Sequence, residues 1–105
     1  GDCPIDRLMT TLRQVLEGYT GEALNGYSYL TENKDGTVFS VVSVGYLPDK
    51  RMVDVGLIVR VVGDRIIIER DVNDKPLVDA LLQANISRQQ IVLAYAGEPV
   101  EESVA

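Results

Sequence analysis

Near the start of the chain, apolar residues recur at steps of three and four positions, which is the spacing of one face of a helix. The stripe runs from Ile5 to Tyr19, with Pro4 placed for a first turn and Gly18 near the end. It predicts an amphipathic helix whose apolar side faces the core. The positions inside the stripe are Leu8, Met9, Leu12, Val15 and Leu16.

Residues 26–71 then carry four β-rich runs, and turn signals at residues 33–36, 47–51 and 63–64 separate them. Strands joined by such short connections pair in antiparallel fashion. This part of the chain therefore predicts a sheet of hairpins.

A second, shorter helix is predicted within residues 73–87. Asp74 lies just before it and is expected to cap it, and Pro76 suits its first turn. Asn85 is placed to end this helix, because asparagine tolerates the left-handed conformation. A last strand follows at residues 91–95.

Ser87 and Gln90 have the spacing of a capping box, which predicts a helical turn before the last strand. The element order α-β-β-β-β-α-β predicts an α+β fold, with an antiparallel sheet of about five strands and two helices packed on one face. Residues 1–105 are expected to form one domain with an acidic tail at 97–105. Gly1, with no methionine before it, is expected to be the remnant of a cleaved tag.

The pair at residues 63–64, Gly-Asp, predicts a two-residue hairpin turn, because glycine adopts the positive φ that such turns need. This turn sets a register in which Val61 lies opposite Ile66 and Ile58 lies opposite Glu69. The core face is then predicted to carry Val55, Leu57, Val59, Val61, Ile66 and Ile68. The outer face is predicted to carry Asp54, Ile58, Arg60, Ile67, Glu69 and Asp71.

Composition restricts the chemistry. The chain has no histidine and one cysteine, Cys3, so it lacks the commonest general base, any disulfide and any Cys/His zinc cluster. The formal net charge is −6, and nucleic-acid binding relies on cationic contacts to phosphates, so the isolated protein is not expected to bind nucleic acid directly. No stretch approaches the roughly 18 apolar residues of a membrane span, and a cytoplasmic protein without a cofactor is expected.

The charged residues after the isoleucine run allow two interpretations. Glu69 and Asp71 could act as paired catalytic carboxylates, which requires an environment that raises one pKa. Alternatively, they lie on a solvated face where Arg60 forms a cross-strand ion pair with Glu69 worth about 0–1 kcal/mol. A cation site from Asp71, Asn73 and Asp74 lacks the glycine and distal glutamate of an EF-hand loop. The solvated face is favoured, and no catalytic, cofactor-binding or metal-binding residue is predicted.

The outer face also carries more branched apolar side chains than a solvated strand needs. Two helices can cover one face of a five-stranded sheet but hardly both. The sequence therefore predicts a protein interface, used by a homodimer or by a heterologous partner. Its residues are Ile58, Arg60, Ile67 and Glu69.

A set of residues along the chain has the order and spacing of one known family. The set comprises Gly45-Tyr46 with Arg51, Gly63-Asp64 before Ile66–Ile68, Asp71 with Asp74, Ile91-Val92-Leu93 with Tyr95, and Val104-Ala105. In these residues the chain resembles the XisI-like family, the fdxN-element excision controlling factor of cyanobacteria, from about Asp6 to Tyr95. It resembles a divergent member, because Ile67 stands where relatives carry tryptophan and Asn85 stands where they carry glycine.

The resemblance implies an accessory factor in the programmed excision of a DNA element, with cutting and joining left to a separate site-specific recombinase. It implies protein partners, either a XisH-like protein with a nuclease-like look or the recombination machinery, and no catalytic residues. Two alternatives stay open. One is an antitoxin-like or assembly module that restrains a XisH-like partner, and the other is an enzyme of unknown type that uses the outer-face carboxylates.

Overall fold

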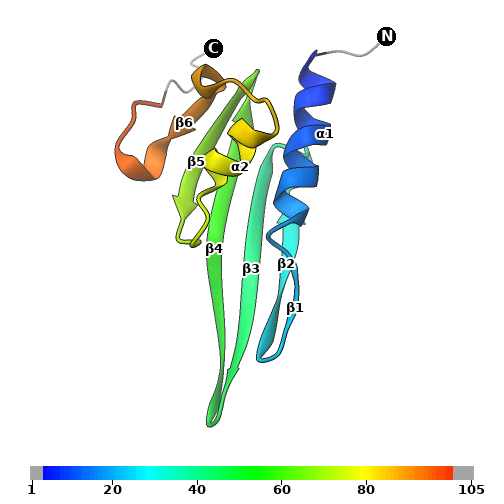
Figure 1. The fold of residues 1–105 in the computed structure, drawn as a ribbon, viewed down its shortest axis with the longest axis vertical. Helices are drawn as coiled ribbons and strands as arrows, with labels where there is room; N and C mark the ends of the chain where they lie inside the picture. Colours follow the sequence, from blue (N-terminus) through cyan, green and yellow to red (C-terminus); the bar gives the residue numbers. More distant parts are fainter. Residues whose placement is uncertain (1–3, 101–105) are drawn as a thin grey trace.

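The computed structural model describes residues 4–100, which form two helices and one sheet (Figure 1). The helices are α1 (Pro4–Glu17) and α2 (Leu77–Gln83), and two 3-10 turns, η1 (Arg88–Gln90) and η2 (Ala94–Ala96), flank the last strand. The strands are β1 (Gly21–Ala23), β2 (Gly26–Glu32), β3 (Val38–Leu47), β4 (Lys50–Val62), β5 (Arg65–Asp71) and β6 (Ile91–Leu93). Gly1, Cys3 and residues 101–105 of the predicted acidic tail lie outside the described residues.

The sheet follows chain order, β1-β2-β3-β4-β5-β6, and the first five strands pair in antiparallel fashion. The prediction of an α+β fold with the second helix before the last strand is confirmed. Two details differ from the prediction. A short sixth strand, β1, precedes β2, and β6 runs parallel to β5. The parallel pairing is possible because the segment that contains α2 is long enough to return the chain to the same end of the sheet.

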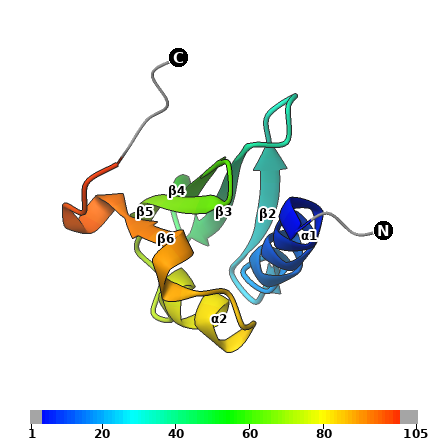
Figure 2. The same ribbon diagram turned by 90° about the horizontal axis from the view of Figure 1, so that it is seen from above.

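Both helices cover the same face of the sheet, as predicted (Figure 2). The stripe on α1 buries Leu8, Leu12 and Leu16, which are one helical turn apart. They meet the inner side chains of β3, β4 and β5 and the apolar side of α2 in a single cluster. The sheet members of this core are Phe39, Val41, Leu57, Val59, Val61, Ile66, Ile68 and Ile91.

The end of α2 follows the sequence prediction closely. Asn85 has φ 69°, in the left-handed region. The N–H groups of Asn85 and Ile86 donate to the carbonyls of Leu82 at 3.0 Å and Leu81 at 3.1 Å, which is the hydrogen-bond pattern of a Schellman motif. The capping box of Ser87 is also present. Helix α2 therefore ends at a defined residue, and the chain continues through η1 into β6.

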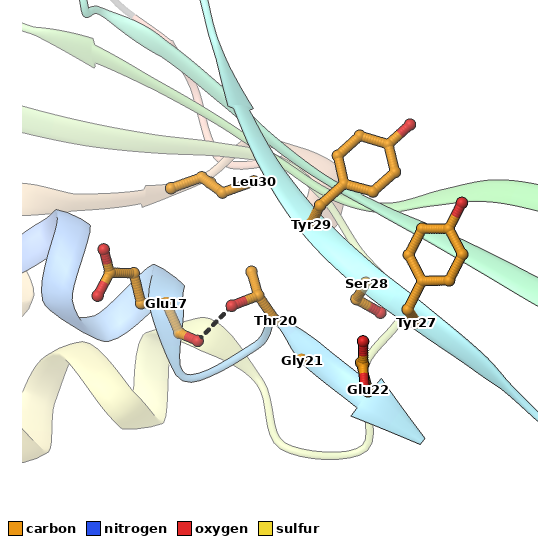
Figure 3. A pocket seen from close by; sticks show the side chains of 8 residues that line it. All are labelled: Glu17, Thr20, Gly21, Glu22, Tyr27, Ser28, Tyr29 and Leu30. Carbon is orange, nitrogen blue, oxygen red and sulfur yellow. Dashed lines mark hydrogen bonds between the residues drawn. The ribbon is translucent and has the colours of Figure 1, made fainter. Parts of the chain in front are cut away.

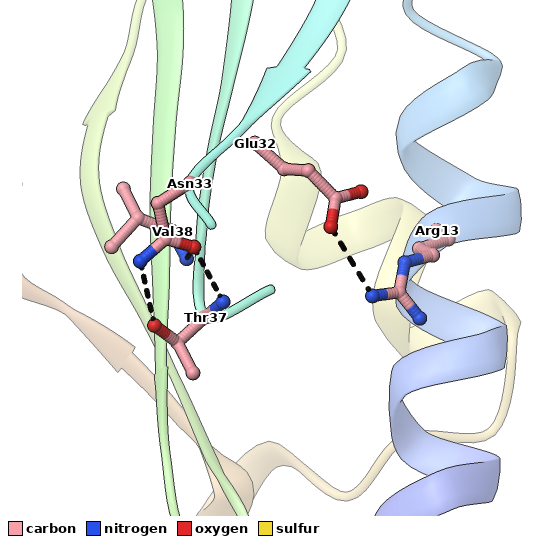
Figure 4. A network of polar contacts seen from close by, with 5 residues as sticks. All are labelled: Arg13, Glu32, Asn33, Thr37 and Val38. Atoms are coloured by element: carbon pink, nitrogen blue, oxygen red, sulfur yellow. Dashed lines mark hydrogen bonds and ion pairs between the residues drawn. The ribbon is translucent and has the colours of Figure 1, made fainter. Parts of the chain in front are cut away.

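The turn between β2 and β3 is held by Asn33 (Figure 4). Its side-chain oxygen accepts hydrogen bonds from the N–H groups of Thr37 at 2.7 Å and Val38 at 2.9 Å. Beside this turn, Arg13 of α1 forms an ion pair of 3.4 Å with Glu32 at the end of β2. These contacts fix the upper end of the β2–β3 hairpin against the helix.

Strands β3 and β4 continue well past the helices, so that their hairpin projects from the body (Figure 1). The molecule is accordingly elongated, with principal extents of 48 × 31 × 27 Å. We call residues 42–55, the projecting end of this hairpin, the arm. Side chains on either side of the arm have no helix above them. No helix within residues 4–100 is long and apolar enough to cross a membrane.

Candidate interaction face

The β4–β5 hairpin keeps its predicted register only near the turn. Val61 lies opposite Ile66, as predicted. Farther from the turn a β-bulge shifts the register, and Ile58 lies opposite Arg70 instead of opposite Glu69 as predicted. The bulge adds one residue to β5, which reverses the alternation of side chains beyond it.

Asp71 consequently faces the helices, and the prediction that it lies on the outer face is wrong. It lies opposite the core residue Leu57. Its carboxylate accepts hydrogen bonds from the N–H groups of Leu77 at 2.6 Å and Asn73 at 3.0 Å, and so it caps the first turn of α2. The prediction that Asp74 caps this helix is also wrong, since Asp74 is exposed and makes no hydrogen bond to α2 within the described residues.

Tyr19 lies near the same carboxylate and joins the end of α1 to the start of α2. Its hydroxyl donates a hydrogen bond to the carbonyl of Lys75 at 2.9 Å. Burial, with the nearby negative charges of Asp71 and Asp79, raises the pKa of Tyr19 to about 12. The phenol therefore remains a hydrogen-bond donor at neutral pH.

We expect Asp71→Ala to lower the free energy of unfolding by about 1–2 kcal/mol, because it removes a helix cap and leaves the Leu77 N–H without its acceptor. Asp74→Ala is the matched control, since Asp74 is exposed, and its effect should stay within about 0.5 kcal/mol. Urea denaturation followed by circular dichroism measures both. Equal effects of the two substitutions would contradict the assignment of the cap.

A second bulge, at Gly56 of β4, changes the faces of the arm. Gly56 is not paired with a residue of β3. As a result, Val55 lies opposite Val42 on the outer face, and Asp54 lies opposite Ser43 on the helix side. The predictions that Val55 belongs to the core and that Asp54 lies on the outer face are therefore wrong. A glycine inside a strand is a known sign of a bulge, and this signal was present in the sequence.

Arg60 and Glu69 form the predicted cross-strand ion pair, with 2.7 Å between Nε and Oε2. Their side chains are 28% and 35% exposed, so the pair contributes only about 0–1 kcal/mol to stability. Glu69 and Asp71 lie on opposite faces of the sheet, and the exposed Asp74 lies in the loop that follows. The three candidate carboxylates are not brought together, and no cluster within residues 4–100 is arranged to hold a metal ion.

Ile67 points to the outer face but is only 2% exposed, which corrects its predicted role as an exposed interface residue. It lies between Arg60 on β4 and Val92 on β6, and η2 packs against β5. Residues 94 and 95 were predicted to extend the last strand, but they turn into η2 instead. Ile58, Arg60 and Glu69 remain accessible in part.

The outer face carries an apolar patch that the predicted register did not reveal. Two consecutive rows across β2, β3 and β4 contain only tyrosine and valine. We call these six residues the tyrosine–valine patch: Tyr27, Val44 and Val53 in one row, and Tyr29, Val42 and Val55 in the next. Within this patch Tyr29 is 43% exposed and Val53 is 53% exposed, whereas Val44 is only 3% exposed.

Tyrosine side chains form the edge of this patch on β2. The rings of Tyr27 and Tyr29 stack with centroids 6.0 Å apart, and Tyr27 approaches Tyr46 of the arm at 6.4 Å. Figure 3 shows both rings of β2 pointing away from α1, whereas Leu30 points toward it from the lining of a groove beside β1. The two faces of β2 are thus clearly divided between core and exterior.

The fold and this face define a small α+β protein whose sheet is covered by helices on one side only. The chain belongs to the XisI family, because the family model described as XisI protein matches residues 5–104. No curated protein matches the sequence.

Two solved structures from Anabaena variabilis ATCC 29413 have a similar fold. One is a XisI-like protein, 12% identical, with a TM-score of 0.66 over 87% of this chain and 85% of that chain. The other is the fdxN element excision controlling factor XisI, 18% identical, with a TM-score of 0.67 over 89% of this chain and 93% of that chain. The XisI-like fold expected from the sequence is confirmed.

Proposed function

We propose that this protein is an accessory factor that controls the excision of a DNA element and that it acts through contacts with other proteins. Membership of the XisI family supports the first part, together with the likeness to the excision controlling factor of Anabaena variabilis. The observation that carries the second part is the outer face, over which neither helix of residues 4–100 packs. In the tyrosine–valine patch Tyr29 and Val53 are exposed, and partly exposed Ile58, Arg60 and Glu69 lie beside it. Together these residues have the composition of a protein interface.

A role without catalysis agrees with the arrangement of the titratable groups. Glu69 is held by Arg60, and Asp71 is engaged as a helix cap. Both carboxylates are thus occupied by contacts within the chain, whereas a general acid or base must be positioned to exchange a proton with a ligand. The chain also contains no histidine. We therefore propose that the reaction belongs to the partner, a XisH-like protein or the recombination machinery.

Direct binding to DNA is not part of this proposal. The net charge is −6, and one of the outer-face arginines, Arg60, is already paired with Glu69. Affinity for duplex DNA depends mainly on neutralising phosphates with cations. The isolated protein should give no shift of duplex DNA at micromolar concentration and low salt. A salt-sensitive complex would contradict an indirect role.

The proposal is tested with a purified XisH-like protein, by measuring the affinity of the two proteins in a titration. We expect Ile58→Lys on the outer face to weaken binding by at least about tenfold, since it places an unpaired charge in the contact. Leu82→Lys is the control, because Leu82 is exposed on α2 at 40% and lies away from the outer face. An affinity that Ile58→Lys leaves unchanged would overturn the assignment of the face.

A further inference from the structure

Charged residues stand at the two ends of the outer face, with the tyrosine–valine patch between them. Arg51 lies in the row nearest the tip of the arm, opposite Tyr46. The ion pair of Arg60 and Glu69 lies at the other end, beside the helical body. The row of Val55 is the third of five, since one row lies between it and Arg51 and one row lies between it and Arg60.

The cation at the tip has no acidic partner among residues 4–100. Arg51 is exposed at the end of the arm, and hydrogen bonds with the hydroxyls of Tyr27 and Tyr46 raise its pKa. No carboxylate within the described residues forms an ion pair with it. At the opposite end, the carboxylate of Glu69 is 35% exposed and can accept a second cation.

We propose that a second copy of this chain packs on the outer face, antiparallel to the first, with a two-fold axis over the row of Tyr29, Val42 and Val55. A two-fold axis there brings Arg51 of each copy close to Glu69 of the other and stacks the row of Tyr29, Val42 and Val55 on itself. The row of Tyr27, Val44 and Val53 then faces the row of Ile58 in the other copy. A symmetric dimer needs a self-complementary surface, and a cation and an accessible anion equidistant from an apolar centre meet that requirement. A partner of one charge sign would match only one end of this face.

The size of the face is typical of a weak, reversible complex. Strands lie about 4.8 Å apart and residues advance about 3.3 Å along them, so five rows on three strands cover on the order of 400–500 Å² per copy. Two such faces bury roughly 800–1,000 Å² in total, at the lower end for specific interfaces. The dimer should therefore form with a dissociation constant in roughly the micromolar range and dissociate on dilution.

The inference rests on the proposed role of the outer face as a protein interface, and it identifies a second copy of this chain as the protein that binds there. Sedimentation equilibrium of the whole protein from about 1 to 500 µM measures the mass. The wild type should change from monomer to dimer within this range. Val53→Glu should weaken the dimer at least about a hundredfold, because it buries a charge in the apolar centre. Met52→Glu is the matched control, since it alters the adjacent residue of the same strand, of similar exposure but on the opposite face.

A charge reversal tests the antiparallel geometry itself. Arg51→Glu and Glu69→Arg should each weaken self-association by about tenfold or more, because each sets like charges against one another in the homodimer. A mixture of the two variants should form a heterodimer of nearly wild-type affinity, since every facing pair is again opposite in sign. No gain on mixing would overturn the antiparallel arrangement.

A wild type that stays monomeric up to 500 µM, or a Met52→Glu variant that dissociates as readily as Val53→Glu, would overturn the second copy as occupant. The two proposals fail separately. The wild type could be monomeric while the Ile58→Lys variant no longer binds the XisH-like protein. That result would support the proposed function and exclude the dimer.

Discussion

Leu12→Ala is expected to lower the free energy of unfolding by about 2–5 kcal/mol, the largest loss among the substitutions considered for stability. Leu12 is fully buried on α1, between Leu8 and Leu16, in the cluster where the helix meets the sheet. Truncation removes apolar burial and leaves a cavity that the surrounding side chains cannot fill without strain.

Urea denaturation of the variant and the wild type measures this loss from the shift in midpoint at constant slope. Ile5→Ala is the matched control on the same helix, because Ile5 is 44% exposed and buries much less area. It should cost below about 1 kcal/mol. If Ile5→Ala cost as much as Leu12→Ala, the side of α1 that faces the sheet would be assigned wrongly.

Local signals in the sequence predicted those parts of the fold that depend on neighbouring residues. The stripe on α1 predicts its buried side, because the helical period alone fixes which residues share a face. Asn85 and Ser87 predict their caps for a similar reason, since each acts on backbone groups only a few residues away. The same holds for the pairing of Val61 with Ile66 beside the turn.

The predictions of the outer face failed where the two bulges lie. Register was extended from the turn by strict alternation, and one extra residue on a strand reverses every face beyond it. For this reason Val55 was placed in the core and Asp71 outside it, the reverse of the structure. Gly56 marks one bulge by its residue type, but Glu69 and Arg70, at the other, are ordinary strand residues without such a mark.

The burial of Ile67 depends on parts of the chain distant in sequence. Its neighbour Val92 belongs to β6, which reaches β5 only after the crossover through α2. A parallel pairing of this kind leaves no local sign in either strand, because its register is set by the packing of the helix and not by a turn. The Ile67 side chain therefore points to the predicted face of the sheet, but it is buried instead of exposed.

The junction of β2 with the arm should be sensitive to a single added methyl group. Gly26 begins β2 and approaches β3 so closely that a Cβ atom would overlap the carbonyl oxygen of Val44. A backbone atom in a ladder cannot move aside without loss of neighbouring hydrogen bonds. We expect Gly26→Ala to destabilise the protein by roughly 1–3 kcal/mol and to displace the tyrosine edge of the outer face.

Gly45→Ala is an unusually close control for this substitution. Gly45 lies directly opposite Gly26 in the ladder, yet a Cβ atom there meets nothing within 4 Å. Its effect on the free energy of unfolding should remain within about 0.5 kcal/mol. Thermal and urea denaturation compare the two variants, and near-ultraviolet circular dichroism reports the environment of Tyr27 and Tyr29. Since both substitutions add the same methyl group to paired residues, a difference between them isolates the close approach at Gly26, and equal stabilities would show that β2 and β3 do not meet in this register.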